Sequence, residues 1–429
     1  MEDLETGLSP TDFWYNYALP LGHTAEAVKY AICALGAAHR AFKFQDMKEH
    51  PSLHELRNLS VQQYNQAIHC VKAIMEKATT EQHMEIILSC CVIFISIENL
   101  HGRYAESLRH LKAGTSLLIS LMSKTDPTED LREFEGIHPD DRATNTPKFL
   151  NHASQALCRL GNDAWGYARD MIAPDLNFDA TTNNDLLFPR SGFTSVGDAE
   201  QSFHNVAKLF EADRMFSALS TSAQTQSHSD ESQIEVSFMT SRVPAQYQQL
   251  PLEELKPIFN HWSERFDLFR LQLDKSKATS QEVLRTRALA VDQALWTGFL
   301  KCDIWTDYQQ DDYEEILRRA ESLVKLDAFQ TNPVFAFDGS LIMSLAIPSV
   351  RSMDCDLQWR AIRLLRSFWR REGMWDSQEL ADILEAMMIA KSRGMVTEDM
   401  LPWDIPHLAR LLNSLQLCDV KIPQGPLLL

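Results

Sequence analysis

Apolar residues recur at three- and four-residue spacing along most of the chain, which is the period of one face of an α-helix. The segment from Ala27 to Phe42 shows this pattern clearly. The same spacing predicts further helices at about residues 60–77, 81–100, 103–123, 149–170, 251–275, 280–306, 311–326, 357–371 and 377–391. No two runs of alternating β-branched residues flank a hairpin turn. We therefore expect an all-α fold, with no sheet larger than a stray hairpin.

One segment, Ile86–Ile97 (IILSCCVIFISI), is apolar on every side instead of on one face. Such a helix is buried within a protein or lies in a membrane. The run is too short to cross a bilayer, which takes about 20 residues. We therefore expect a large multi-helix, bundle-like body with this apolar helix buried at its centre, and no contact with a membrane.

Polar stretches divide the predicted helices. Residues 1–12 are expected to form an N-terminal tail, and residues 13–429 a single helical domain. Within that domain we expect an acidic loop at 124–147 and a flexible loop at 217–235. The second contains the low-complexity sequence SALSTSAQTQSHSDES, which has too few apolar residues to form a core.

The charge and the cysteines narrow the class of protein. A formal net charge of −18 repels phosphate backbones, so direct binding of duplex DNA is not expected. The eight cysteines include no C-x-x-C pair, which is typical of reduced thiols in a cytosolic or nuclear protein. The acidic N-terminus has no apolar run of the kind found in signal peptides.

Several segments together resemble the regulatory, fungal-specific domain that follows the zinc cluster of fungal transcription factors. The resemblance extends from about residue 12 to about residue 415, and it rests on the order and spacing of the segments. They are Phe13-Trp14, Ala27–Phe42, QYNQAI from Gln63, GRYAESLRHLKAG from Gly102, FTSVGDAE from Phe193, FAFDGSLI from Phe335 and RAIRLLRSFWRREGMWDS from Arg360. The resemblance implies a transcriptional regulator with a helical body.

The chain departs from that family in two respects. The zinc cluster needs six cysteines in a short basic stretch, because thiolates bridge its two zinc ions, and no cysteine precedes the first family segment. The sequence RLGND at residues 159–163 stands where relatives continue from RLD into an apolar helix, and other family stretches after FAFD are also replaced. The resemblance therefore implies a regulator without its DNA-reading half, and the other changes reflect either drift or a remodelled interior.

The same region carries a candidate metal site. Residues 162–170 (NDAWGYARD) resemble the second metal motif of class I terpene cyclases. On a helix, Asn162, Gly166 and Asp170 fall on one face at steps of about 6 Å. Oxygen atoms of Asn162, Asp163 and Asp170 could hold Mg²⁺, with the small Gly166 leaving room for water and diphosphate.

Three further residues of this motif have candidate catalytic roles. Arg169 stands beside the acid, where it could pair with a diphosphate leaving group. The rings of Trp165 and Tyr167 could stabilise a carbocation through their π-faces.

A second acidic group begins with Asp311 and Asp312 and ends with Glu315, and it fits the aspartate-rich D-D-x-x-E metal motif of the same enzymes. Asp303 and Asp307 precede it at four-residue steps and are alternative ligands. The two motifs occur in the reverse of the usual order along the chain. That order argues against direct descent from terpene cyclases, and a site reached independently on another helical scaffold stays compatible with it.

Each of these motifs also has an ordinary structural explanation. An acidic run at a helix start stabilises the helix dipole on a solvated face, and a polar stripe on a helix is usually exposed. Aromatic residues at helical spacing are most often part of the core.

Two hypotheses therefore remain. The first is a cytoplasmic, Mg²⁺-dependent class-I-like sesquiterpene cyclase that ionises farnesyl diphosphate, similar to the humulene-type cyclases of fungal meroterpenoid pathways. The second is a nuclear transcriptional regulator of the zinc-cluster family that lacks its own DNA-binding domain. We favour the enzyme at this point, and the sequence does not determine the oligomeric state.

Overall fold

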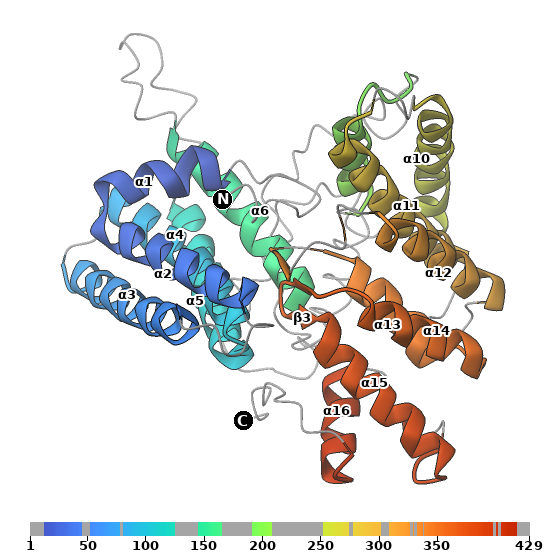
Figure 1. Cartoon of the computed structure of the whole chain (residues 1–429). Helices are drawn as coiled ribbons and strands as arrows, with labels where there is room; N and C mark the ends of the chain where they lie inside the picture. Colours follow the sequence, from blue (N-terminus) through green and yellow to red (C-terminus); the bar gives the residue numbers. More distant parts are fainter. Residues whose placement is uncertain are drawn as a thin grey trace, which may run out of the picture. The chain divides into compact units, whose positions relative to one another are not determined.

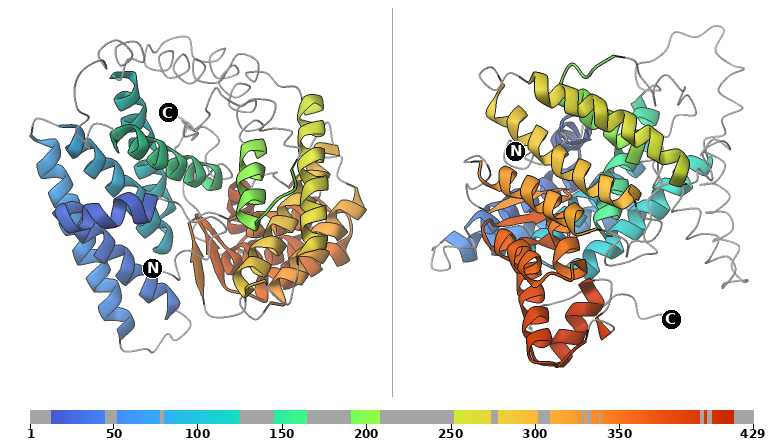
Figure 2. Two further views of the ribbon diagram at one scale, coloured as in Figure 1. Left: turned by 90° about the horizontal axis from the view of Figure 1, so that it is seen from above. Right: turned by 90° about the vertical axis from the view of Figure 1, so that its right-hand side faces the viewer.

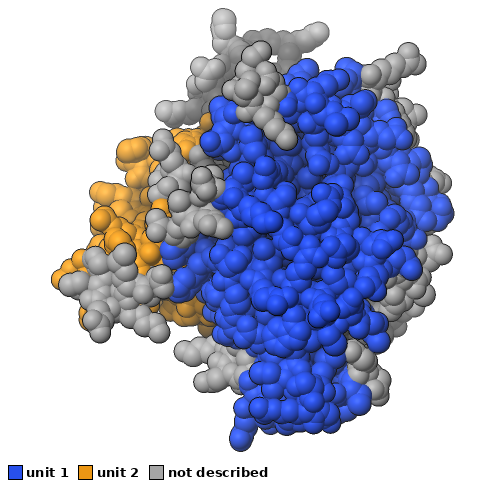
Figure 3. All heavy atoms as spheres, turned by 45° about the vertical axis from the view of Figure 1, so that its right-hand side comes forward, with its two compact units in different colours: residues 1–9, 180–217, 244–423 blue, residues 10–179, 218–243, 424–429 orange. Residues whose placement is uncertain are grey.

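The structure, a computed structural model, describes residues 13–44, 52–77, 80–124, 145–164, 191–207, 252–273, 278–301, 309–326, 329, 333–337, 339–397, 400–401 and 405–417. Its elements are almost all helical (Figure 1). The chain divides into two compact units, coloured in Figure 3. Unit 1 comprises residues 1–9, 180–217 and 244–423, and unit 2 comprises residues 10–179, 218–243 and 424–429. Our expectation of one helical domain over residues 13–429 stays a prediction.

The described part of unit 2 is an assembly of antiparallel and crossing helices, drawn from blue to green in Figures 1 and 2. It begins with a short π-helical segment that leads into a short α-helix. The elements are η2 (Trp14–Ala18), α1 (Leu19–Thr24), α2 (Glu26–Lys43), α3 (Ser52–Met75), α4 (Glu81–Leu100), α5 (Tyr104–Lys124) and α6 (Asn145–Ala164).

Helix α4 is the centre of unit 2. It begins at a capping box, in which the Thr80 hydroxyl accepts the backbone N–H of His83 and the His83 ring accepts that of Thr80. Residues Gln82–Leu100 are long and apolar enough to cross a membrane by length and composition alone. However, 83% of their most apolar window is buried inside the protein. Helices α2, α3, α5 and α6 all pack against α4, and the expected buried central helix is confirmed.

A glycine on α5 allows α4 and α6 to approach that helix closely. A Cβ atom at Gly114 of α5 would lie 3.2 Å from the Cβ of Cys91 on α4 and 3.2 Å from the side chain of Leu157 on α6. These distances are shorter than ordinary van der Waals contacts. The glycine at the end of the GRYAESLRHLKAG segment therefore sets the spacing of the three helices.

The described part of unit 1 contains the remaining helices and a small sheet, drawn from green to red in Figures 1 and 2. One helix spans residues 196–207. The other elements are α10 (Leu252–Gln272), α11 (Ser280–Lys301), α12 (Gln310–Val324), β1 (Val334–Ala336), α13 (Leu341–Arg351), α14 (Cys355–Arg366), β2 (Arg370–Glu372), β3 (Trp375–Asp376), α15 (Ser377–Ser392) and α16 (Ile405–Ser414).

The sheet has three strands in the order β1-β2-β3. Strand β1 is parallel to β2, with Val334 opposite Arg370, and β3 returns antiparallel to β2. The turn between β2 and β3 contains Gly373 at φ 52°, a left-handed conformation that favours glycine. We expected no sheet larger than a stray hairpin, and this expectation is wrong. Strands of two or three residues show no alternation, and the partner of β1 lies two helices further along the chain.

The predicted helices differ from the observed ones at several ends. The helix predicted at residues 357–371 ends at Arg366, and strand β2 begins four residues later at Arg370. Helix α13 was not predicted, since its apolar residues form a short continuous run that contains Pro348. The all-α class itself is confirmed.

Candidate functional site

The motif at residues 162–170 lies almost wholly outside the described residues. Helix α6 ends at Ala164, so the backbones of Asn162 and Asp163 form its last turn. The side chains of these two residues are not described. Trp165, Gly166, Tyr167, Arg169 and Asp170 lie beyond the described part of this segment, as do Asp303 and Asp307. Their roles as metal ligands or catalytic residues remain predictions.

Asp312 in the second acidic motif has partners within the protein. Its side chain is 6% exposed and forms an ion pair with Lys301, with 2.5 Å between Nζ and Oδ1. The other carboxylate oxygen accepts the backbone N–H of Gln309 at 3.2 Å, at the start of α12. Asp312 thus joins the end of α11 to the beginning of α12. Its neighbour Asp311 is exposed in the same first turn.

Glu315 pairs with two arginines of its own helix. Its carboxylate accepts hydrogen bonds from Arg318 at 2.6 and 2.7 Å and from Arg319 at 2.6 Å. Partial burial raises the pKa of Glu315, but the hydrogen bonds from both arginines outweigh this and hold the pKa below its ordinary value. Within the described residues, no three His, Cys, Asp or Glu side chains are grouped in a way that could hold a metal ion.

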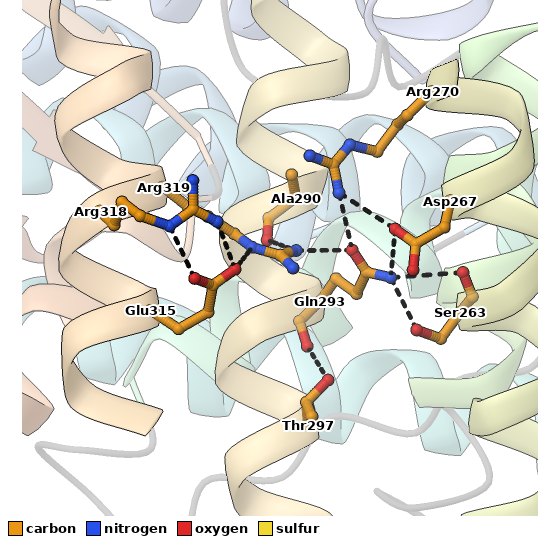
Figure 4. A network of polar contacts seen from close by, with 9 residues as sticks. All are labelled: Ser263, Asp267, Arg270, Ala290, Gln293, Thr297, Glu315, Arg318 and Arg319. Atoms are coloured by element: carbon orange, nitrogen blue, oxygen red, sulfur yellow. Dashed lines mark hydrogen bonds and ion pairs between the residues drawn. The ribbon is translucent and has the colours of Figure 1, made fainter. Parts of the chain in front are cut away.

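Arg319 also belongs to a polar network that joins three helices (Figure 4). The buried Gln293 of α11 stands at its centre and accepts hydrogen bonds from Arg319 at 2.6 Å and from Arg270 of α10 at 3.3 Å. Its amide nitrogen donates to Ser263 and Asp267 of α10. The network therefore fixes the packing of α10, α11 and α12.

A second network lies in unit 2, at the end of the apolar helix α4. Glu98 is 2% exposed, and its carboxylate accepts the Tyr64 hydroxyl at 2.6 Å and pairs with Arg103 at 2.6 Å. The Tyr64 oxygen also lies 2.8 Å from Nε2 of His110. Because the single hydroxyl proton points to Glu98, the contact with His110 requires a proton on Nε2. Tyr64, Glu98 and His110 come from α3, α4 and α5, so the network joins three helices.

Burial governs the ionisation of this network. It raises the pKa of Glu98 above its ordinary value, although Tyr64 and Arg103 oppose the shift. Burial and the bond to Glu98 raise the pKa of Tyr64. Burial also lowers the pKa of His110, and the nearby Arg103 adds to this effect. Tyr64 and His110 are therefore neutral near pH 7, and Arg103 favours the ionised form of Glu98.

Two of the segments that resemble the family meet in this network. Tyr64 belongs to QYNQAI, whereas Arg103 and His110 belong to GRYAESLRHLKAG. The turn between α4 and α5 contains Gly102 at φ 66°, where the N–H of Arg103 donates to the carbonyl of Glu98. These segments therefore supply three of the four side chains of this network.

Two further segments meet at the sheet of unit 1. Glu372 on β2 is 1% exposed, bonds to Arg370 at 2.6 Å and accepts the backbone N–H of Ile342 at 2.9 Å. That N–H belongs to the first turn of α13, where a carboxylate also stabilises the helix dipole. A Cβ atom at Gly339 would lie 2.3 Å from the Glu372 side chain, so only glycine fits beside it. Glu372 comes from the segment at residues 360–377, and Gly339 and Ile342 come from FAFDGSLI.

The segment FTSVGDAE begins the helix at residues 196–207. The Asp198 carboxylate accepts the backbone N–H groups of Thr194 and Ser195, and the Ser195 hydroxyl accepts that of Asp198. The hydrogen bonds from Thr194 are the largest cause of the lowered pKa of Asp198.

The same segment is attached to α10 and α11. The Arg265 guanidinium lies 3.9 Å from the centre of the Phe193 ring, and Glu200 pairs with Arg285. The Trp262 indole donates to the carbonyl of Ala199 at 3.0 Å. All these contacts attach the segment to α10 and α11.

The sequence model of the fungal-specific transcription factor domain matches residues 7–385. That span covers most of the chain and includes every buried polar network described above. The chain belongs to this family. The family resemblance inferred from the sequence is therefore confirmed.

A curated relative is similar over a shorter stretch. The aspercryptin biosynthesis cluster-specific transcription regulator of Emericella nidulans is 29% identical over 92 residues, which is 21% of this chain. The match covers 15% of that regulator's length. No solved structure matches the chain.

The family match overturns the prediction of a Mg²⁺-dependent sesquiterpene cyclase. The chain belongs to a family of transcription factor domains, and its relative is a transcription regulator. The physical reason is visible at residues 311–315, where the acidic pattern resembles a metal motif. Asp312 and Glu315 are engaged there by Lys301, Arg318 and Arg319.

The buried residues Glu98, Glu372 and Gly339 were not singled out from the sequence. For two of them, the neighbouring sequence contains a feature that indicates a buried carboxylate. Glu98 interrupts an apolar run just before a Gly-Arg turn, and Glu372 follows two arginines and precedes a glycine. A carboxylate in such surroundings needs a buried partner. Two of the partners, Tyr64 and Ile342, lie 34 and 30 residues away in sequence, and only the fold identifies them.

Proposed function

We propose that this chain is the regulatory domain of a fungal transcription regulator and acts in the nucleus. The observation that carries the proposal is the family match over residues 7–385. The arrangement of the family segments supports it, because in each unit they meet as buried polar networks that fix helix packing. Such a body suits contacts with other proteins better than chemistry.

The relative suggests which genes are controlled. Its name describes a regulator specific to a biosynthetic gene cluster. We propose that this chain likewise regulates a cluster of biosynthetic genes. The similarity extends over a small part of that relative, so the proposal concerns the class of target genes and not the product of the cluster.

We further propose that contact with promoter DNA comes from outside these 429 residues. The eight cysteines are scattered and include no group of six in a basic stretch. The net charge of −18 also disfavours a phosphate-binding surface. A partner protein or another segment with a zinc cluster would supply the DNA contact.

A reporter assay in a filamentous fungus tests the regulatory function. The full chain is fused to an unrelated DNA-binding domain whose target site precedes a reporter gene. We expect reporter transcription to change several-fold relative to the DNA-binding domain alone. Gly339→Leu, which collides with Glu372, should remove the effect, whereas Gly192→Ala, whose added Cβ meets open space, should keep it. An unchanged reporter at equal protein levels would contradict the proposal.

A further inference from the structure

Two arginines of unit 1 donate to the same uncharged oxygen atom. Nη1 of Arg270 on α10 and Nη1 of Arg319 on α12 lie 3.3 and 2.6 Å from the side-chain oxygen of Gln293 on α11. Both guanidinium groups point toward that oxygen in Figure 4. An ionised acceptor makes stronger hydrogen bonds with a guanidinium group than an amide does. The two arginines are therefore arranged around a place that would suit an anion.

The arginine cluster, which consists of Arg270, Arg318 and Arg319, carries more charge than its partners balance. Asp267 pairs with Arg270, and the carboxylate of Glu315 is shared by Arg318 and Arg319. Among the described partners, three cations thus stand against two anions, in a chain whose net charge is −18. Burial is the largest cause of the lowered pKa of Arg270, and the charge of Arg319 is the next. The cluster therefore holds a surplus positive charge that is only partly hydrated.

Both guanidinium groups keep donors for a further ligand. Within the described part of the chain, Arg270 donates only through Nη1, to Asp267 at 3.1 Å and to Gln293. Arg319 donates through Nε to Glu315 and through Nη1 to Gln293 and a backbone carbonyl, so its Nη2 is left as well. The side chains of Arg270 and Arg319 are 34% and 16% exposed, so the cluster is recessed but accessible to solvent.

Rigid neighbours fix the position of the shared acceptor. Gln293 is 2% exposed, and its amide nitrogen donates to the Ser263 hydroxyl at 2.6 Å and to the Asp267 carboxylate at 3.2 Å. These bonds turn the amide oxygen toward the arginines. Because the guanidinium groups are already held by that oxygen, little conformational freedom is lost when a ligand joins them.

We propose that Arg270 and Arg319 bind a phosphoryl group beside Gln293, and that this group joins α10 to α12. Each Nη2 atom donates to a different phosphoryl oxygen. A phosphoryl group offers three acceptor oxygens in different directions, so it can accept from guanidinium groups of two helices at once. A carboxylate has two coplanar oxygens and matches a single guanidinium fork best. The recessed position selects inorganic phosphate or a small phosphate ester instead of a polymer.

The charges around the site set a modest affinity. Two guanidinium groups supply charge-assisted hydrogen bonds, whereas Asp267 and Glu315 repel a further anion. We expect a dissociation constant of roughly 0.1–1 mM, and weaker binding as the salt concentration rises. The anion also replaces the repulsion between Arg270 and Arg319 by attraction to both. Bound phosphate should therefore stabilise the packing of α10, α11 and α12.

Isothermal titration calorimetry of the full chain with inorganic phosphate, in a phosphate-free buffer, tests the proposal. Arg270→Gln should weaken binding at least tenfold, because it removes one of the two cations. Arg270→Lys keeps the charge but not the guanidinium fork, and should weaken binding about threefold. The control Arg393→Gln removes the same charge from an exposed residue at the end of α15, outside the cluster, and should leave the affinity unchanged.

Asp267→Asn separates ligand binding from a purely structural role. An asparagine oxygen can still accept from Arg270 and from Gln293, whereas the negative charge beside the ligand is removed. Phosphate should therefore bind several-fold more tightly to this variant than to the wild type. A network that only holds the helices together would show no such gain.

Glycerol phosphate and acetate, titrated alongside inorganic phosphate, identify the chemistry of the ligand. Acetate should bind at least tenfold more weakly than either phosphate compound, because it offers a single charge and two oxygens. Tighter binding of glycerol phosphate would assign the site to phosphate esters. Equal or weaker binding of glycerol phosphate would assign it to inorganic phosphate.

Three outcomes of these titrations would overturn the proposal. The first is no binding at about 5 mM phosphate, well above the expected dissociation constant. The second is acetate binding as tightly as phosphate, and the third is phosphate binding that Arg270→Gln leaves unchanged. Hydrogen exchange of the wild-type chain covers the case in which that variant does not fold. Phosphate should slow exchange in α10 and α12 and leave α3 of unit 2 unchanged, and unaltered exchange in α10 and α12 would contradict the proposal.

Discussion

Gly339→Ala tests whether the sheet of unit 1 is fixed by one buried carboxylate. The new Cβ atom would lie 2.3 Å from Cδ and 2.6 Å from Cγ and Oε1 of Glu372. Glu372 is bonded on one side to Arg370 and on the other to the N–H of Ile342. The side chain must therefore leave both partners to make room.

The magnitude follows from those two bonds. Removing one partner of a buried ion pair costs about 3–5 kcal/mol, because the other charge stays buried without compensation. Arg370 is only 6% exposed and has little access to water in this position. We therefore expect Gly339→Ala to lower the free energy of unfolding of unit 1 by about 3–5 kcal/mol. The control Gly192→Ala meets open space and should stay within about 1 kcal/mol of the wild type.

A double-mutant cycle makes the test specific. Glu372→Ala removes the clash together with the bonds, so adding Gly339→Ala to it should cost little more. Urea unfolding, followed by tryptophan fluorescence and by hydrogen exchange in α13, measures the four proteins. The reasoning is refuted if Gly339→Ala is near neutral, or if the two substitutions are additive, because either result means that the glycine and the carboxylate do not interact.

Three further predictions concern unit 2 and DNA. Tyr64→Phe removes the hydroxyl that donates to the buried Glu98, so urea unfolding should show a loss of about 1.5–3 kcal/mol; a loss below 0.5 kcal/mol would contradict this role. Burial raises the pKa of Glu98 in the folded state above its value in the unfolded chain. The folded protein is therefore stabilised by protonated Glu98 at low pH, and this stabilisation is lost as the pH rises from the unfolded-state pKa through the folded-state pKa. In that window Glu98→Gln should therefore gain stability relative to the wild type as the pH increases, and parallel pH profiles in urea titrations would argue against the shift. The isolated chain should not bind duplex DNA with sub-micromolar affinity at physiological salt, because its net charge is −18; tight, sequence-specific retention in a gel-shift assay would disprove this.

The sequence alone determined the helical class, the buried central helix and the family, since each depends on local spacing. Three- and four-residue periodicity predicts a helix wherever it occurs. The all-round apolar run at Ile86–Ile97 marks a core helix. The order of short segments such as QYNQAI and FAFDGSLI indicates the family without knowledge of their contacts.

The tertiary structure alone decided what the polar residues of those segments do. Asp311 to Glu315 resemble a metal motif, because the pattern of acids does not reveal that Lys301 of the preceding helix pairs with Asp312. Glu98 and Glu372 each acquire one partner from a helix that is distant in sequence, Tyr64 of α3 and Ile342 of α13. Backbone periodicity is a local property, whereas the pairing of a buried charge depends on which elements meet in space. For that reason the sequence predicted where this chain is helical, and only the fold showed which carboxylates join its helices and strands.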